Sequence, residues 1–355
     1  MSAEVSFGRK VRRDFFATPL DSVITLAFSA LLIYLLYGVL SWGIFNAIWG
    51  GDSADVCRAD GAKHGACWTV INVRWRLILF GLYPYEEQWR SAIACMVILV
   101  TAVLSCIPYF WTGKRLALTW ISGFAAFYLL MKGGILGLPL VVERDWGGLS
   151  LTVFIFSSVA MIGMPMSIVI ALMRRSKLPL IARPTAFLID VTRSLPLLSI
   201  MFTAAVVIPF VLPQWLQGDK LYRIIIGFAI FFAAYQAEII RGGFQAVPSG
   251  QEEASAALGL NYWQNLWYIM LPQVFRAALP PTINQFVITF KETSLVVLIG
   301  FFEVLASGAA AFGTAEWKFA YKEVYVFVGL IFFVFVLSLS RYGAYLERRL
   351  SVEQR

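Results

Sequence analysis

The sequence predicts an all-α, polytopic integral membrane protein, and two observations support this class. Of the 355 residues, 59% are hydrophobic and 14% are charged, whereas about a quarter are charged in an average soluble domain. The apolar residues also form long blocks, because no Lys, Arg, Asp or Glu interrupts the 29 residues from Val23 to Gly51 or the 23 residues from Ser91 to Gly113. About 20 such residues span a bilayer as a helix, which satisfies each backbone N–H within its own segment.

The apolar blocks predict about eight transmembrane helices. The first block is too long for the core of a cleavable signal peptide, so we expect it to remain as a helix. The expected spans are residues 23–49, 91–112, 116–139, 150–173, 185–212, 222–240, 282–305 and 323–340.

The distribution of Lys and Arg predicts that both termini are cytoplasmic. The termini and the loops on their side hold 16 of these residues, whereas the opposite short loops hold 5, or 10 when residues 51–90 are included. Cytoplasmic loops carry the excess in membrane proteins. The net charge of +8 is gathered in short clusters at the ends of apolar blocks, so we expect lipid and no nucleic acid as a partner.

Residues 51–90 form the longest predicted extracytoplasmic segment. Its aromatic residues suggest a piece that lies along the membrane interface, and a compact extracytoplasmic fold is the alternative. Cys57 and Cys67 could form a disulfide there, with two free thiols as the other reading. The single histidine, His64, has no Cys or carboxylate at metal-ligand spacing, so we expect no metal site.

The polar content of the helices predicts a division of the chain at the short loop 142–148. Residues 1–149 are expected to form an N-terminal extension with three transmembrane helices and the segment 51–90. Residues 150–345 would form a core of five transmembrane helices with a long cytoplasmic loop at 241–280, followed by a cytoplasmic tail at 346–355. Loops of that length within a compact domain tend to be functional.

The loop 241–280 predicts two short helices set at an angle. Residues 251–258 are good helix formers, and Gly259 can end that helix in a left-handed conformation. Pro272 stands where a second short helix is expected to end or bend.

The spacing in this loop resembles the EAA signature of permease subunits in bacterial ATP-binding-cassette importers. The match comprises Glu253-Ala254-Ser255, three residues, Gly259, nine residues, Ile269, one residue and Leu271-Pro272, with Ser255 in place of the second alanine. The segments 190–198 and 291–295 are similar to the polar-amino-acid-uptake branch, which usually has Glu at the position of Asp190 and Asp at the position of Glu292.

This resemblance implies a subunit that translocates L-amino acids across the bacterial inner membrane. The implied partners are a second permease subunit, two ATPase subunits and a periplasmic amino-acid-binding protein, and the EAA loop would dock on the ATPase. The extension is similar to that of the larger subunit of general L-amino-acid importers, and its three helices favour a permease partner of different sequence.

The same chain lacks the residues for ATP hydrolysis. It contains no G-x-x-x-x-G-K-[ST] phosphate loop. With one histidine, no nucleophile, base and orienting group form a recognisable set. We therefore expect a transport subunit that is not an enzyme and binds no cofactor, with ATP and magnesium used by the partner ATPase.

Ionisable residues at membrane depth are the candidates for the substrate pathway, because they are costly there unless they face a cavity or a partner. Asp190 and Arg193 share a helical face and could pair with each other, or could receive the ammonium and carboxylate of an amino acid. Lys291 could likewise pair with a substrate carboxylate. The hydroxyls of Thr293 and Ser294 could line the same pathway or simply bond to the backbone.

Two other functions are compatible with buried charges in a helical membrane protein. An ion-coupled secondary transporter would carry substrate without an ATPase, but it has no need of a cytoplasmic docking loop. A scaffold or signalling subunit could keep the docking loop and lack a substrate pathway.

Overall fold

The computed structural model describes residues 7–58, 65–135 and 137–352, and within these ranges it is helical with no β-strand. Two isolated backbone bridges, Ile48 with Cys67 and Gly148 with Glu303, are the only extended pairings in the described ranges. His64 and the end of the predicted tail at 353–355 lie outside the described residues.

Among the residues that the structure describes, six helical segments are long and apolar enough to cross a membrane, and a bent pair of helices makes a seventh. This result confirms the class of all-α multi-pass membrane protein. The expected span 116–139 corresponds to α5 (Gly113–Lys132), which carries Lys114, Arg115 and Lys132 and is not among the seven. The segments are Pro19–Phe45, Tyr85–Ser105, Gly148–Arg174, Lys220–Ala246, Tyr262–Ile299, Lys318–Arg349 and the pair Pro179–Ser194 with Leu197–Val211.

The bent pair corrects the expectation of one helix at 185–212. The chain forms α7 (Pro179–Ser194) and then α8 (Leu197–Phe202), a π-helical turn at Thr203–Val207 and α9 (Ile208–Val211), with a bend of 103° at the break. Pro196 follows Leu195, whose φ of −94° and ψ of 141° are extended. Proline disfavours helical dihedrals in the preceding residue and donates no backbone hydrogen bond, so the helix stops there.

The second short helix expected in the cytoplasmic loop does not end at Pro272. α13 (Tyr262–Gln264) continues through a π-helical turn at Asn265–Met270 into α14 (Leu271–Glu292) and a 3₁₀ segment at Thr293–Ile299. Pro272 lies in the first turn of α14, where its missing N–H is not needed. The helix expected at 282–305 therefore begins earlier in the chain, and it ends at Gly300, whose φ is 91°.

The chain divides into two compact units. The first contains residues up to Trp75 together with Phe312–Val324. It holds α1 (Phe7–Phe15), α2 (Pro19–Leu40), a π-helical turn at Ser41–Phe45 and a 3₁₀ turn at Ala54–Cys57. No residue of α2 is buried, and α3 (Thr69–Phe80) begins in this unit.

Part of the segment 51–90 folds compactly with residues from far along the chain. The structure joins the sulfur atoms of Cys57 and Cys67, whose Cα atoms lie 5.9 Å apart. The backbone N–H of Cys67 donates to Glu323 at 3.0 Å, and Arg58 donates to the carbonyl oxygen of Glu316 at 2.8 Å. These contacts favour the compact fold over a segment that merely lies along an interface.

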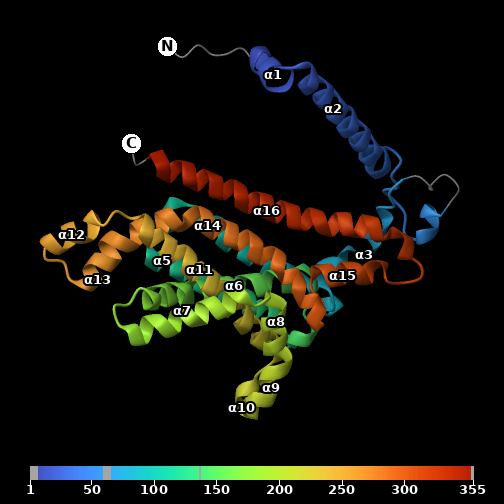
Figure 1. Ribbon diagram of the computed structural model, residues 1–355. Helices are drawn as coiled ribbons and strands as arrows, with labels where there is room; N and C mark the ends of the chain where they lie inside the picture. Colours follow the sequence, from blue (N-terminus) through green and yellow to red (C-terminus); the bar gives the residue numbers. More distant parts are fainter. Residues whose placement is uncertain (1–6, 59–64, 136, 353–355) are drawn as a thin grey trace. The chain divides into compact units, whose positions relative to one another are not determined.

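The second unit contains residues 76–311 and 325–355 and is built around α6 (Gly148–Arg174) and α11 (Lys220–Ala246) (Figure 1). Gly163 of α6 faces the ring of Phe232 of α11 so closely that a Cβ atom would clash with it. The absence of a side chain thus allows the two longest buried helices to approach each other.

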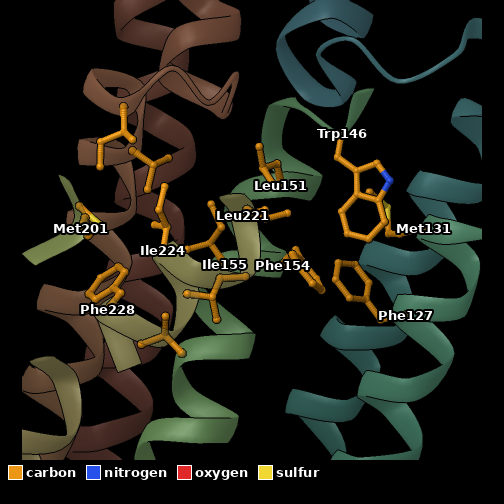
Figure 2. Packing of buried hydrophobic residues seen from close by; sticks show 14 of the residues in the cluster. Phe127, Met131, Trp146, Leu151, Phe154, Ile155, Met201, Leu221, Ile224 and Phe228 are labelled. Atoms are coloured by element: carbon orange, nitrogen blue, oxygen red, sulfur yellow. The ribbon is translucent and has the colours of Figure 1, made fainter. Parts of the chain in front are cut away.

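The helices before α6 pack onto this pair through a buried aromatic cluster (Figure 2). α5 brings Phe127 and Met131 into one cluster with Phe154 of α6, and α4 (Gln88–Ser105) contributes Ala94 and Ile98 to it. The ring of Phe127 lies 5.9 Å from that of Phe154, and Trp146 meets the same ring edge-on at 4.9 Å. The second unit also holds α10 (Gln214–Gln217), α12 (Gly250–Ala257), nearly all of α15 (Val304–Phe312) and most of α16 (Tyr321–Val352).

Candidate coupling and transport site

The loop after α11 forms a short helix and a turn at the positions expected from sequence. α12 spans Gly250–Ala257, and Gly259 has a φ of 72°. Glu252 and Glu253 lie in the first turn of α12, where acidic side chains interact favourably with the unpaired N–H groups of the helix start. A residue with a Cβ would be strained at Gly259, so glycine sets the angle at which the chain leaves α12.

α12 presents one face to the body and another to the surroundings. Ser255 is buried, and its hydroxyl donates to the carbonyl oxygen of Glu252 at 2.8 Å. Glu253 and Ala254 are exposed, and Leu258 after the helix is 78% exposed. The departure from the alanine of the EAA signature therefore falls on the inner face, and the outer face keeps the Glu-Ala pair.

The second arm of the loop is anchored by apolar residues. Leu266, Met270 and Leu271 are buried in a cluster with Ile240 and Phe244 of α11. Ile269 is half-buried and Pro272 is exposed. Four aromatic side chains of the arm are exposed on its surface: Tyr262, Trp263, Trp267 and Tyr268. α12 and the arm 262–272 thus form a projection that buried residues anchor, which we name the supported knob. Exposed aromatic residues on its outer surface suit docking to another protein.

Arg175 ties α12 to the end of α6. Its Nη2 donates to Oε1 of Glu252, and its guanidinium lies 4.5 Å from the centre of the Phe244 ring. A pocket of about 380 Å³ lies beside this contact, and its lining includes Arg175, Phe244, Pro248, Glu252 and Met270. Packing between α12 and the end of α11 is therefore incomplete, and Arg175 contacts a residue of each of these two helices beside the gap.

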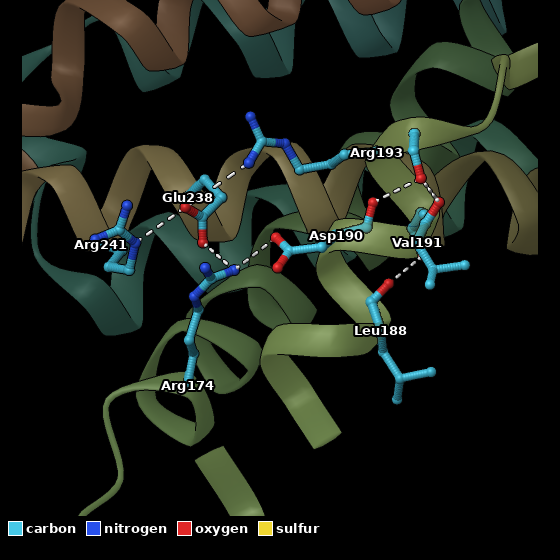
Figure 3. Close-up of polar contacts among 9 residues, drawn as sticks. Arg174, Leu188, Asp190, Val191, Arg193, Glu238 and Arg241 are labelled. Atoms are coloured by element: carbon cyan, nitrogen blue, oxygen red, sulfur yellow. Dashed lines mark hydrogen bonds and ion pairs between the residues drawn. The ribbon is translucent and has the colours of Figure 1, made fainter. Parts of the chain in front are cut away.

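A second set of charges joins α6, α7 and α11 (Figure 3). Glu238, whose side chain is 11% exposed, lies 2.8 Å from Arg174, 2.9 Å from Arg241 and 3.8 Å from Arg193. Arg174 also lies 3.4 Å from Asp190. These five residues, which we name the Glu238 network, contain three cations and two carboxylates.

The Glu238 network corrects one expectation. Asp190 and Arg193 share a helix, but the structure does not pair them, because Asp190 contacts Arg174 and Arg193 contacts Glu238. Glu238 and Arg241 pair at the end of α11, because side chains three residues apart lie on the same face of a helix. Asp190 remains 62% exposed, so its carboxylate is still accessible.

The candidates at the end of α14 make local contacts. The hydroxyl of Thr293 donates to the carbonyl oxygen of Phe290 at 2.7 Å, and that of Ser294 donates to the carbonyl oxygen of Lys291 at 2.8 Å. The backbone-bonding alternative therefore describes both hydroxyls here. Lys291 itself is exposed.

Three site residues were missed by sequence reasoning. Arg174 and Arg175 contributed only to the charge count that set the topology, and Glu252 is not one of the matched positions of the EAA signature. Two sequence features could have indicated them. The arginines are adjacent at the end of an apolar block, and Glu252, 77 residues after Arg175, lies at the acidic start of a helix. In the described ranges, no group of three or more His, Cys, Asp or Glu residues could hold a metal ion.

The sequence of the second part of the chain matches a known protein family. Residues 163–352 match the family described as "Binding-protein-dependent transport system inner membrane component". The chain belongs to this family, and it is therefore an inner-membrane permease subunit of an ATP-binding-cassette transport system rather than an enzyme. The alternative of an ion-coupled secondary transporter is excluded by this membership. An EAA motif and a coupling helix are typical of this family.

Particular relatives resemble the chain over nearly its whole length. The inner membrane amino-acid ABC transporter permease protein YhdY of Escherichia coli K12 is 36% identical over 96% of this chain and 92% of its own. The glutamate/glutamine/aspartate/asparagine transport system permease protein BztC of Rhodobacter capsulatus is 30% identical over 97% of this chain and 94% of its own. Both alignments include the N-terminal extension.

A solved structure resembles part of the chain. The crystal structure of an amino acid ABC transporter with histidines contains a chain that is 30% identical, with a TM-score of 0.51. The match covers 57% of this chain and 92% of that chain.

Proposed function

We propose that this chain carries L-amino acids across the inner membrane as one permease subunit of an importer. The observation that carries the proposal is the supported knob formed by α12 and the arm 262–272. Its inner residues are buried, whereas Glu253, Ala254, Gly259 and the exposed aromatic residues form an outer face. A rigid element can transmit a push from a partner that a flexible loop would absorb. The names of the amino-acid permeases that resemble the chain support the substrate class.

The proposed assembly contains a second, different permease subunit, two ATPase subunits and a periplasmic amino-acid-binding protein. The ATPase subunits would use ATP and magnesium, and the knob would dock on one of them. Both termini would face the cytoplasm, with 51–90 outside. In this arrangement residues 1–149 are an extension, residues 150–345 the permease core and residues 346–355 a tail.

The docking role is tested by reversing charge on the outer face. Glu253→Lys and Gly259→Asp in the full complex are expected to reduce copurification of the ATPase and to stop uptake into proteoliposomes, while the permease still inserts. Glu347→Lys is the matched control for Glu253→Lys, because Glu347 is exposed on α16 and the two substitutions make the same change of charge. Normal uptake and full ATPase recovery with both loop variants would contradict the docking role.

The substrate pathway is proposed to involve Asp190 and Arg193, with Lys291, Thr293 and Ser294 as further candidates. Asp190 is accessible, and Arg193 lies 3.8 Å from its carboxylate partner Glu238, so both could exchange partners for the ammonium and carboxylate of an amino acid. Asp190→Asn and Arg193→Gln are expected to raise the substrate concentration for half-maximal uptake without loss of assembly. Unchanged uptake by both, and by Lys291→Ala, would favour a scaffold subunit.

A further inference from the structure

Two adjacent arginines at the end of α6 have separate sets of partners. Arg174 is the last residue of α6, and Arg175 follows it in a helical conformation. Successive side chains of a helix project about 100° apart, since a turn holds 3.6 residues. Arg175 contacts Glu252 of α12 and Phe244 of α11, whereas Arg174 contacts Glu238 of α11 and Asp190 of α7.

The contact of Arg175 is placed to transmit movement of α12. The pocket of about 380 Å³ lies between the first turn of α12 and the end of α11, so close packing does not join these elements there. Gln251 of α12 also accepts a hydrogen bond from Gln273, at 3.2 Å between exposed side chains. The Arg175–Glu252 pair is stronger than this hydrogen bond because both of its groups are charged. The Phe244 ring adds a cation–π interaction with the guanidinium.

The ion pairs of Arg174 would change if the end of α6 moved. Its Nη1 lies 2.8 Å from Oε1 of Glu238, but that oxygen accepts no hydrogen bond of good geometry from any residue that the structure describes. Glu238 would keep Arg241, at 2.9 Å, if Arg174 moved away. Asp190 would instead lose the cation that lies 3.4 Å from it. A shift of Arg174 thus changes the surroundings of Asp190 more than those of Glu238.

We propose that Arg174 and Arg175 form a relay, in which movement of the coupling helix α12 displaces the end of α6 through Arg175 and changes the hold of Arg174 on Asp190. Both arginines are positioning residues, because they act through other side chains. The inference rests on the proposed function, since α12 must move with the ATPase and Asp190 must face the pathway. Nucleotide-driven motion would then control whether Asp190 is free to bind an ammonium group.

The first test separates hydrolysis from transport by charge exchange in the reconstituted complex. Arg175→Glu and Glu252→Arg are each expected to leave ATPase copurification intact, because the outer face is unchanged, and to lower uptake per ATP hydrolysed by about tenfold, within the range of typical coupling between sites. The double exchange is expected to restore most of that ratio. Lys177→Glu is the matched control, since Lys177 lies two residues on and makes no ion pair with any residue that the structure describes.

The second test addresses the other half of the relay. Arg174→Gln is expected to change the substrate concentration for half-maximal uptake together with uptake per ATP, and to have no further effect on that concentration when Asp190 is already Asn. A structural role alone would lower the amount of folded complex without this dependence on Asp190. Arg175→Lys keeps the charge but loses the flat contact with Phe244, and is expected to fall between wild type and Arg175→Glu.

The outcomes distinguish the relay from the docking role. Loss of the ATPase from the Arg175→Glu complex would overturn the relay and place Arg175 on the docking surface. Failure of the double exchange to restore coupling, or an equal defect from Lys177→Glu, would also overturn it. Failure of the docking role is recognised separately, because Glu253→Lys would then leave both ATPase recovery and uptake unchanged.

Discussion

The hydroxyl of Tyr222 lies 2.5 Å from Oε1 of Glu143, and the Nζ of Lys132 lies 2.8 Å from the same oxygen. Tyr222 belongs to the part of the chain that matches the family, whereas Lys132 and Glu143 precede it. Tyr128 completes the cluster, with its hydroxyl 2.8 Å from that of Tyr222 and 3.1 Å from Lys132. This cluster therefore fastens the end of the N-terminal extension to α11, beside the aromatic contact of Phe127 with Phe154.

Removing the charge of Glu143 is expected to loosen the extension. Glu143→Gln replaces a carboxylate that accepts two hydrogen bonds, one of them from an ammonium group, so the free energy of unfolding should fall by about 1–3 kcal/mol. Thermal denaturation of the detergent-solubilised protein measures the change. Asp145→Asn is the matched control, because exposed Arg144 is the one ion-pair partner of Asp145 among the described residues. This substitution should change stability by less than about 0.5 kcal/mol. Equal effects of the two variants would contradict the role of the cluster.

The stabilisation by Glu143 is expected to disappear in acid. Burial raises the pKa of this carboxyl, but the hydrogen bonds from Lys132 and Tyr222 outweigh it, and the pKa is lowered overall. The contribution is thus fully present above the unfolded-state pKa of about 4.3 and is lost as the pH falls through the lower folded-state pKa. The difference in melting temperature between wild type and Glu143→Gln should stay constant from neutral pH to about pH 5 and shrink below it. A difference that grows in acid would contradict this assignment.

Gly163 is expected to tolerate no side chain. Gly163→Ala places a methyl group against the Phe232 ring, and overpacking of this kind costs about 1–3 kcal/mol. Gly329→Ala in α16 is the control, because no atom lies within 4 Å of the added Cβ and alanine favours a helix by about 0.5–1 kcal/mol. Melting temperatures of the two variants should therefore move in opposite directions. A neutral Gly163→Ala would show that α6 and α11 can separate at this point.

Cys57 and Cys67 are expected to be oxidised in the protein as it is made in cells. Intact mass without reductant should be lower than the reduced mass by about two hydrogens. Cys57→Ser should destabilise the first unit by about 2–3 kcal/mol, because it reopens a short loop. Limited proteolysis after Arg58 and Arg74 would report this change. Cys106→Ser is the control, since Cys106 is a free, half-buried thiol, and no change of mass on reduction would refute the disulfide.

Local features of the site were predictable from the sequence. The start of α12 and the left-handed conformation of Gly259 depend on helix propensity and on the freedom of glycine, which act within a few residues. The expected helix at 251–258 and its end at Gly259 are accordingly confirmed by the structure. The break at Pro196 also has a local cause, but a continuous apolar block from 185 concealed it.

The partners of the charged residues were not predictable in this way. Asp190 and Arg193 share a face, yet each contacts a residue of another helix, because those helices bring an opposite charge closer. Likewise, Glu252 and Arg175 are 77 residues apart, and neither residue carries a local signal for the other. The expectation that Pro272 ends or bends a helix was also wrong. A π-helical turn precedes Pro272, which therefore lies in the first turn of α14.

The sequence by itself determined the membrane class, the approximate spans and the membership suggested by the EAA spacing, because hydrophobic length, charge placement and motif spacing are properties of the linear chain. Tertiary structure alone decided the ion-pair partners, the contacts of Arg58 and Cys67 with residues 312–324 and the attachment of the end of the extension to α11. Such contacts depend on how packed helices orient side chains that are distant along the chain, and no local preference specifies that orientation.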